Sequence, residues 1–265
     1  MKFYVSVDME GIGGIAYREQ IMRGEIYYQE ARQLLTEETN AVVEALVEAG
    51  ATEIVVKDAH ALGLNFLYDR LHSAASYVLG PLKLPNRFPG IDSSFDGALL
   101  IGYHAMAGTE GAILDHSWSY YDIYGLELNG NPIGEIGFEA LLFGLRDVPV
   151  IFVSGDDKAC AEARCQLGTT FTYETKKALG RHSGVLKAPK RVCSEIGEAV
   201  KEAVRGRTTC KPYTLPGPYE MKIDYTSANL AEAHVYNESD TFRTGGRTRV
   251  IRDDDLLRLL TRTFM

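Results

Sequence analysis

The chain has 265 residues, of which 45% are hydrophobic and 24% are charged, and its formal net charge is −8 at pH 7. This length can bury a substantial core, and this composition is that of a globular protein rather than a disordered or membrane one. The negative charge, with no basic block, disfavours general nucleic-acid binding. No apolar run reaches the roughly 18 residues that span a bilayer, and no signal peptide is evident, so a cytoplasmic protein is expected. Four cysteines without a CxxC pair favour free thiols.

Strands alternate with helices along the chain, which favours an α/β fold with a largely parallel central sheet flanked by helices. Apolar residues recur at helical spacing in residues 26–49, and residues 97–102 are almost wholly apolar, as in a strand buried on both faces. A smaller C-terminal α+β lobe is expected, with domains at 1–160 and 161–265 or one continuous domain. The predicted strands are 2–5, 52–57, 97–102, 148–153, 220–225 and 247–251. The predicted helices are 26–49, 138–146, 156–165, 189–205, 228–234 and a terminal helix, and residues 104–124 form an ordered loop.

Two acidic residues follow the first predicted strand. Asp8 and Glu10 lie two positions apart, so their carboxylates can point to the same side of a strand. Gly11, Gly13 and Gly14 come next, and glycines let the backbone turn sharply beside a ligand. Paired acids at a strand end suggest a metal site, although a single acid at such a position is more often a solvated cap.

Histidines follow two further strands in the same way, His60 after residues 52–57 and His104 after residues 97–102. In open α/β sheets, ligands bind at the carboxyl ends of the strands, so these side chains are expected at one edge of the sheet. Considered alone, His60 could be a turn residue and His104 a hydrogen-bonded core histidine. The recurrence at three strand ends favours a shared site.

A further acid, Glu135, completes a set of candidate metal ligands, although it could instead merely favour a helix N-terminus. Imidazole combined with carboxylate suits zinc, manganese or cobalt, whereas magnesium and calcium prefer shells made of oxygen alone. The set is too large for one tetrahedral catalytic zinc but sufficient for two metals that share a bridging carboxylate. The candidate ligands are Asp8, Glu10, His60, His104 and Glu135.

The remaining histidines and tyrosines give weaker signals. His116, in an aromatic loop, could orient a ligand, act as a general acid or base, or be a plain loop histidine. His72, His182 and His234 lack a neighbouring motif and are expected to be structural or solvent-facing. Tyrosines could line a substrate pocket, although packing is their commoner role; those considered are Tyr27, Tyr28, Tyr120, Tyr121 and Tyr124.

Five short motifs, in their order and spacing, resemble those of the D-aminopeptidase family of two-zinc peptidases. The stretch at 148–157 (VPVIFVSGDD) is also similar, and the likeness extends weakly through 225–248, so it covers nearly the whole chain. The motif set is specific, whereas the C-terminal third is much less so. The motifs are 6–11 (SVDMEG), 57–60 (KDAH), 102–105 (GYHA), 115–117 (DHS) and 134–137 (GEIG).

The resemblance implies a metallo-aminopeptidase that removes the N-terminal residue of short peptides. It implies two zinc ions per subunit on the five candidate ligands, with Asp8 as the bridge and His116 as an additional catalytic histidine that shuttles protons or steadies the oxyanion. It also implies a homo-oligomer, a ring-like decamer whose internal channel restricts access to short peptides. The family name suggests substrates that contain D-amino acids, but no residue in the sequence reveals the chirality of the pocket.

Two other functions stay open from the residues alone. Carboxylate–histidine sites also serve other two-metal hydrolases, such as amidases and phosphoesterases, because a fold does not decide the substrate. A phosphoesterase would usually need cationic clamps for the phosphate, and none adjoins these motifs. The other possibility is a metal-stabilised binding or assembly protein without turnover, whose metals would keep no open coordination position.

Overall fold

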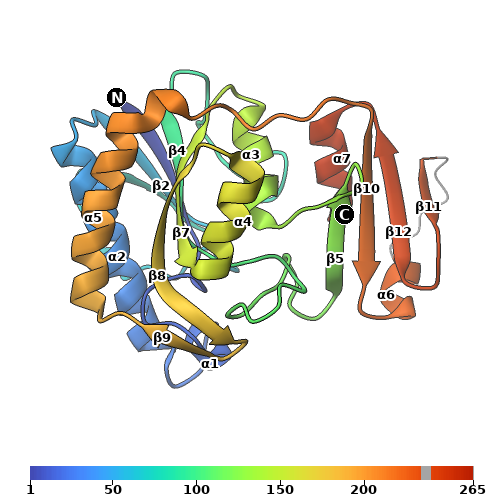
Figure 1. Ribbon diagram of the computed structural model, residues 1–265, viewed down its shortest axis with the longest axis horizontal. Coiled ribbons are helices and arrows are strands. Elements are labelled where there is room, and N and C mark those ends of the chain that lie inside the picture. Colours follow the sequence, from blue (N-terminus) through green and yellow to red (C-terminus); the bar gives the residue numbers. More distant parts are fainter. Residues whose placement is uncertain (234–239, 265) are drawn as a thin grey trace.

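Two β-sheets lie side by side in the computed structural model, which describes residues 1–233 and 240–264 (Figure 1). The larger, sheet A, has the strand order β3-β2-β1-β4-β7-β8-β9, and only its last pair, β8 and β9, is antiparallel. The expected parallel α/β sheet is therefore confirmed. Its strands are β1 (Lys2–Val7), β2 (Glu53–Asp58), β3 (Ser76–Val78), β4 (Gly97–Tyr103), β7 (Val150–Asp156), β8 (Phe171–Gly180) and β9 (Ser183–Leu186).

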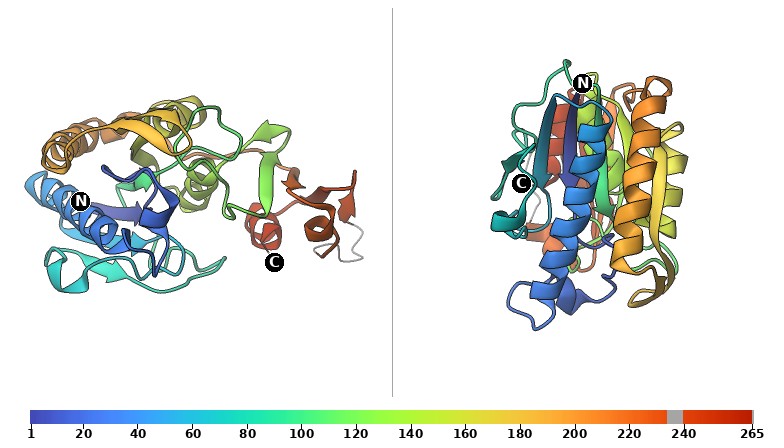
Figure 2. Two further views of the ribbon diagram at one scale, coloured as in Figure 1. Left: turned by 90° about the horizontal axis from the view of Figure 1, so that it is seen from below. Right: turned by 90° about the vertical axis from the view of Figure 1, so that its left-hand side faces the viewer.

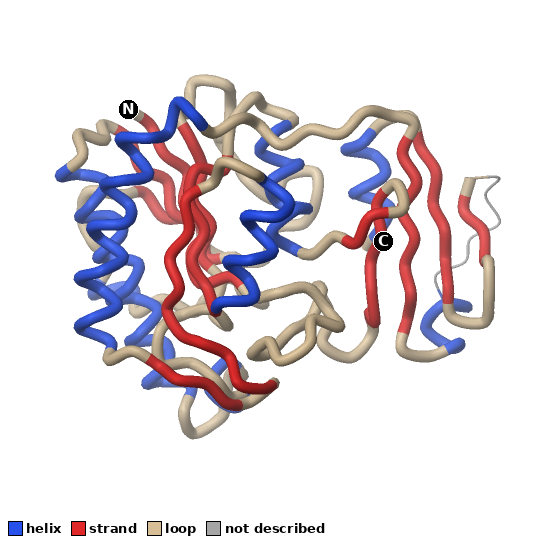
Figure 3. Tube along the Cα trace, viewed as in Figure 1, coloured by secondary structure: helices blue, strands red, loops and turns tan. Residues whose placement is uncertain are grey.

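The smaller sheet, sheet B, is antiparallel and extends away from the main body of the molecule (Figures 2 and 3). Its strand order is β11-β12-β10-β5-β6. Each sheet takes strands from both sides of residue 160, and the division of the chain there stays a prediction. The elements of sheet B are β5 (Ile123–Leu128), β6 (Asn131–Pro132), β10 (Tyr219–Tyr225), β11 (Thr241–Arg243) and β12 (Thr248–Asp253), accompanied by α6 (Ala228–Ala233) and α7 (Leu256–Thr263).

Helices cover both faces of sheet A, with α2 and α5 side by side on one face and α3 and α4 on the other (Figures 1 and 2). Among the described residues, no helix is long and apolar enough to cross a membrane. A short helix, α1, precedes α2. The bounds are α1 (Arg18–Ile21), α2 (Tyr28–Glu48), α3 (Glu135–Gly144), α4 (Asp157–Leu167) and α5 (Pro189–Gly206), with 3₁₀ turns at Tyr68–Arg70 and Arg207–Thr209.

Alternate residues of β1 belong to two separate hydrophobic cores. Phe3 and Val5 pack with α2 and α5, whereas Tyr4 packs with α3 and with residues of sheet B. All three side chains are fully buried. Because both faces of the strand are covered, β1 reads as a continuous apolar run rather than an alternating one.

The structure differs from the predicted elements in several places. The helix expected at 138–146 begins earlier, so Glu135 is its first residue. The prediction lacks the short helix α1 and the strands β3, β5, β6, β8, β9 and β11. Strand β8 carries charged residues such as Lys176 and Lys177, which weaken an apolar strand signal. The helix expected at 228–234 ends at Ala233 within the described residues, and His234 lies outside them.

The ends of β1 and β4 approach closely, and this closeness positions the site. Strand β1 lies between β2 and β4, so the chain leaves β1 toward one side and later returns on the other, which makes a topological switch point. The Gly11 amide donates to the Gly102 carbonyl at 2.7 Å. A side chain at Gly11 would collide with the Tyr103 carbonyl, so only glycine allows this approach.

Candidate metal centre

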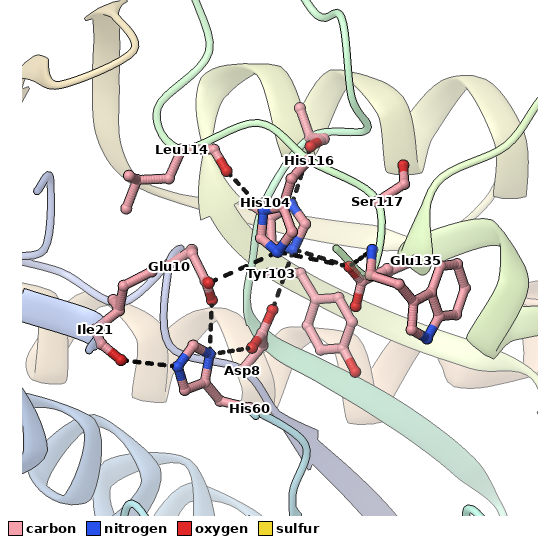
Figure 4. Close-up of polar contacts among 12 residues, drawn as sticks. Asp8, Glu10, Ile21, His60, Tyr103, His104, Leu114, His116, Ser117 and Glu135 are labelled. Atoms are coloured by element: carbon pink, nitrogen blue, oxygen red, sulfur yellow. Dashed lines mark hydrogen bonds and ion pairs between the residues drawn. The ribbon is translucent and has the colours of Figure 1, made fainter. Parts of the chain in front are cut away.

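The predicted site residues lie together at the carboxyl edge of sheet A (Figure 4). The acids Asp8 and Glu10 follow β1, while His60 and His104 follow β2 and β4. Glu135 begins α3, and its Oε1 accepts a hydrogen bond from the Trp118 amide at 2.7 Å. The loop between β4 and β5 contributes His116. The structure therefore brings all six residues into one cluster, which consists of Asp8, Glu10, His60, His104, His116 and Glu135.

Each histidine of the cluster has one ring nitrogen within hydrogen-bond distance of a backbone carbonyl. Since a carbonyl oxygen can only accept, we assign one ring proton to that nitrogen, and the other nitrogen is the one that can bind a metal ion. A backbone partner of this kind orients metal-binding histidines in proteins. The donors and acceptors are His60 Nε2 to Ile21 O at 3.0 Å, His104 Nδ1 to Ala105 O at 3.0 Å and His116 Nδ1 to Leu114 O at 2.8 Å.

The other ring nitrogens face the carboxylates. Burial lowers the pKa of His60 and His104, but the facing carboxylates raise it well above its ordinary value. His60 Nδ1 lies 3.3 Å from Asp8 Oδ1 and 3.1 Å from Glu10 Oε2. His104 Nε2 lies 3.4 Å from both Asp8 Oδ2 and Glu135 Oε1. The two oxygens of Asp8 thus face different histidines, which is the arrangement that a carboxylate bridging two metals needs.

The donor set fits metal ions on two grounds. In the part of the chain that the structure describes, His104 Nε2 is buried and has no hydrogen-bond partner. A lone pair that faces carboxylate oxygens is unfavourable unless a cation lies between them. Mixed imidazole and carboxylate ligands suit zinc. There are two sets of donor atoms in which every atom lies within 4.8 Å of the others in its set. One set comes from Asp8, Glu10 and His104, and the other comes from His104, His116 and Glu135.

The electrostatics of the metal-free cluster point the same way. Burial and then the negative charge of Glu10 raise the pKa of Asp8 to about 7. The buried carboxylates of Asp8 and Glu10 repel each other, and protonation of one of them relieves the repulsion. A divalent cation would relieve it more fully and would keep both groups ionised.

His116 lies against the cluster rather than inside it. Its ring stacks on that of His104 with the centroids 3.8 Å apart, and its Nε2 is 3.8 Å from both Glu10 Oε1 and Glu135 Oε1. Burial and then the neighbouring His104 lower the pKa of His116 below its ordinary value. The imidazole is therefore neutral at pH 7 and can accept a proton.

Two residues of β8 hold the loop that carries Glu10. The buried Lys176 ammonium donates to the carbonyls of Glu10, Ile12 and Ile15 at 2.5, 2.9 and 2.5 Å. The Thr175 hydroxyl donates to the Gly11 carbonyl at 2.6 Å. These contacts satisfy the carbonyls of a buried turn. No periodicity in the sequence indicates this role, because β8 lies more than 150 residues further along the chain.

Replacing Lys176 with methionine is expected to lower the free energy of unfolding by about 2–4 kcal/mol, because three buried carbonyls lose a charged donor. Denaturant unfolding of the zinc-free protein at pH 7 measures this loss. Lys177→Met is the control, since Lys177 is the exposed neighbour. Its free energy of unfolding should differ from that of the wild type by no more than about 0.5 kcal/mol. Equal midpoints for the two variants would contradict the role of Lys176.

A second unpredicted group fixes the loop that carries His60. Asp58 accepts from the Asn65 amide at 2.6 Å and from its side chain at 2.8 Å. The Asn65 side chain also donates to the His60 carbonyl at 2.8 Å, and the Tyr28 hydroxyl donates to Asn65 Oδ1 at 2.7 Å. The carboxylate of Asp58, within the motif at 57–60, is thus a support for His60 and not a member of the cluster.

The cluster opens into a cavity of about 360 Å³. Tyr28 and Tyr120 line this cavity together with Tyr121, whereas Tyr27 and Tyr124 do not. No cationic clamp was expected beside the motifs, but the folded chain brings three arginines to the cavity wall. These are Arg18, Arg23 and Arg87.

Comparison with known proteins gives one consistent result. The family model described as D-aminopeptidase matches residues 1–263. The D-aminopeptidase of Bacillus subtilis (strain 168) is 32% identical to this chain over 257 residues, which are 97% of this chain and 93% of that protein. A solved structure of a Zn-dependent D-aminopeptidase, DppA from Bacillus subtilis, described as a self-compartmentalizing protease, superposes with a TM-score of 0.94. It is 30% identical, and the match covers 100% of this chain and 96% of that one.

Proposed function

The chain belongs to the D-aminopeptidase family and is a metal-dependent aminopeptidase, and we propose that the six-residue cluster is its two-zinc active site. The observation that carries this assignment is the common orientation of the three histidines. Each donates one ring proton to a backbone carbonyl and turns its other nitrogen toward the carboxylates. Nitrogens oriented in this way are the ligands that zinc requires, and zinc binding releases any proton that they carry.

We assign the five ligands to two neighbouring positions that share Asp8. His60 and Glu10 would hold one ion, because His60 Nδ1 lies 3.3 Å from Asp8 Oδ1 and 3.1 Å from Glu10 Oε2. His104 and Glu135 would hold the other, since His104 Nε2 is 3.4 Å from Asp8 Oδ2 and from Glu135. When bound, the ions supply an activated water and polarise the scissile carbonyl.

His116 is the proposed catalytic residue. The Leu114 carbonyl fixes the proton on Nδ1, so Nε2 is free to take a proton from the attacking water and to return it to the leaving amine. Its lowered pKa keeps this nitrogen unprotonated at neutral pH. The residue lines the cavity, where a substrate can reach it.

The substrate is proposed to be a short peptide with a free amino terminus, and the family membership favours D-residues. A cavity of about 360 Å³ has room for a few residues and not for a folded chain. Assembly into a homo-oligomer is proposed from the solved relative, which is described as self-compartmentalizing. The ring of ten subunits and the cytoplasmic location stay predictions.

We expect the purified protein to contain two zinc ions per chain and to release N-terminal amino acids from dipeptides, faster from D- than from L-enantiomers. Metal analysis together with a panel of D- and L-dipeptides measures both properties. A chelator should abolish turnover, and zinc should restore it. Hydrolysis of a phosphomonoester and not of dipeptides would favour the phosphoesterase alternative, and bound zinc without any turnover would favour a binding protein.

A further inference from the structure

Arg18, the first residue of α1, is a half-buried cation on the wall of the cavity. Its guanidinium carbon lies 5.1 Å from the ring centroid of Tyr121 and 5.9 Å from that of Tyr120. Within residues 1–233 and 240–264, no carboxylate forms an ion pair with it and no acceptor a hydrogen bond. The guanidinium is therefore held by aromatic faces while its hydrogen-bond donors stay available.

Two neighbouring arginines differ from Arg18 in this respect, whereas Arg23, which also has no such partner among the described residues, is exposed. Arg87 also reaches the cavity, but its Nε donates to the buried Glu139 at 2.6 Å. Arg181 stacks on Tyr120 as well, and its Nη1 donates to Asp115 at 2.5 Å. The chain has 36 acidic and 28 basic residues, so carboxylates are in excess. A cation that has no acidic partner in such a chain, and that faces the active-site cavity, is suited to an anionic group of the substrate.

The helix that carries Arg18 is fixed to the active site at its C-terminal end and capped at its N-terminal end. Its last residue, Ile21, accepts the hydrogen bond from His60 Nε2 at 3.0 Å. The Gln20 side chain accepts from the Ala16 and Tyr17 amides at 2.8 and 2.9 Å. The position of Arg18 relative to the metal ligands is thus set by the same contact that orients His60.

The distance from His116 to Arg18 has an upper limit that a short peptide can span. The Tyr120 ring lies close to both, with its centroid 5.8 Å from the His116 ring centroid and 5.9 Å from the Arg18 guanidinium carbon. The two groups are therefore no more than about 12 Å apart. A peptide extends at most about 3.3–3.6 Å per residue, and a guanidinium–carboxylate hydrogen bond adds about 2.8 Å. A di- or tripeptide cleaved at its first bond would place its terminal carboxylate at Arg18.

We propose that Arg18 determines specificity by binding the C-terminal carboxylate of the peptide substrate. This inference rests on the proposed function, because it takes the metal cluster as the point of cleavage. A planar guanidinium can hold a carboxylate through two parallel hydrogen bonds, and the two tyrosine rings keep that plane in position. The enzyme should then prefer di- and tripeptides with a free carboxylate over peptide amides and over longer chains.

The test compares an alanyl dipeptide with its C-terminal amide, both in the enantiomeric form that the wild-type enzyme hydrolyses faster. In the zinc-containing full-length enzyme, Arg18→Gln should lower kcat/KM for the free acid about 10- to 100-fold, which is the usual effect of a charged hydrogen bond. The change should lie mainly in KM and not in kcat, because Arg18 contacts the carboxylate in the bound substrate as well as in the transition state. For the amide, the kcat/KM of Arg18→Gln should agree with that of the wild type within about 3-fold.

Arg23→Gln is the matched control, because Arg23 lines the same cavity but is exposed. It should leave the ratio of acid to amide unchanged, and Arg18→Lys should give an intermediate ratio because it keeps the charge but not the planar fork. Equal losses on acid and amide, or a changed ratio in Arg23→Gln alone, would overturn the proposal. If the wild type hydrolyses neither compound, the proposed function is wrong. In that case calorimetry would compare the binding of the acid and of the amide to the wild type and to Arg18→Gln. Weaker binding of the acid alone to Arg18→Gln would support the role of Arg18, and equal changes for acid and amide would overturn it.

Discussion

Replacing His116 with alanine is expected to lower kcat by about 10²- to 10⁴-fold, the range for loss of a general acid–base group, while zinc content stays at two ions per chain. The reason is its position: the ring stacks on His104 at 3.8 Å, and Nε2 is free to exchange a proton. Steady-state kinetics on a dipeptide, with metal analysis of the same sample, measures both quantities. Added imidazole should restore part of the rate.

Two results would remove His116 from the proposed role. Unchanged turnover would show that the residue takes no part in the reaction. A loss of one zinc ion would make it a ligand, which is an alternative with a structural basis because its Nε2 lies with donors of His104 and Glu135. His72→Ala is the control: His72 pairs with Glu44 at 2.7 Å, far from the cavity, and its replacement should leave kcat within about 2-fold of the wild type.

Replacing Asp8 with asparagine is expected to lower kcat/KM by roughly 10³-fold or more and to reduce bound zinc below two ions per chain. An amide carries no negative charge and cannot bridge two cations, so both ions lose a shared ligand. The structure supports this expectation, since Oδ1 faces His60 and Oδ2 faces His104. Metal content after dialysis and the rate at saturating zinc measure the two effects.

A matched control is available in Glu162→Gln. Glu162 is another buried carboxylate, its Oε2 accepts from the Met106 amide at 2.7 Å, and burial raises its pKa to about 7. Glutamine therefore replaces a carboxyl group that is already partly neutral at pH 7. Zinc content and kcat/KM should change little. If Asp8→Asn kept both ions and full activity, Asp8 would not be the bridge.

Much of the fold could be predicted from residue patterns because its central elements have strong local signals. The continuous apolar run of β4 and the helical spacing of α2 each reflect burial that one segment imposes on its own residues. Strand β8 lacked such a signal: Lys176 is buried, but only because distant carbonyls accept its hydrogen bonds. A single segment cannot indicate a partner that lies elsewhere in the chain.

The cluster could be predicted for a related reason. Parallel strands end at the same edge of a sheet, so residues that follow successive strands, such as Asp8, His60 and His104, come together whatever the details of packing. The supporting residues could not be predicted in this way. Asn65 lies on a loop and Arg18 begins the short helix α1, and their roles depend on the direction of side chains across the cavity.

The sequence by itself therefore determined the class of fold, the family and the residue types of the metal cluster, because these follow from local patterns and from the order of strand ends. Only the tertiary structure decided which nitrogen of each histidine is free and which oxygen of Asp8 faces which imidazole. It also decided that Arg18 keeps its donors available. These properties depend on hydrogen-bond partners such as the Ile21 carbonyl, far from His60 in the chain and adjacent to it only after folding.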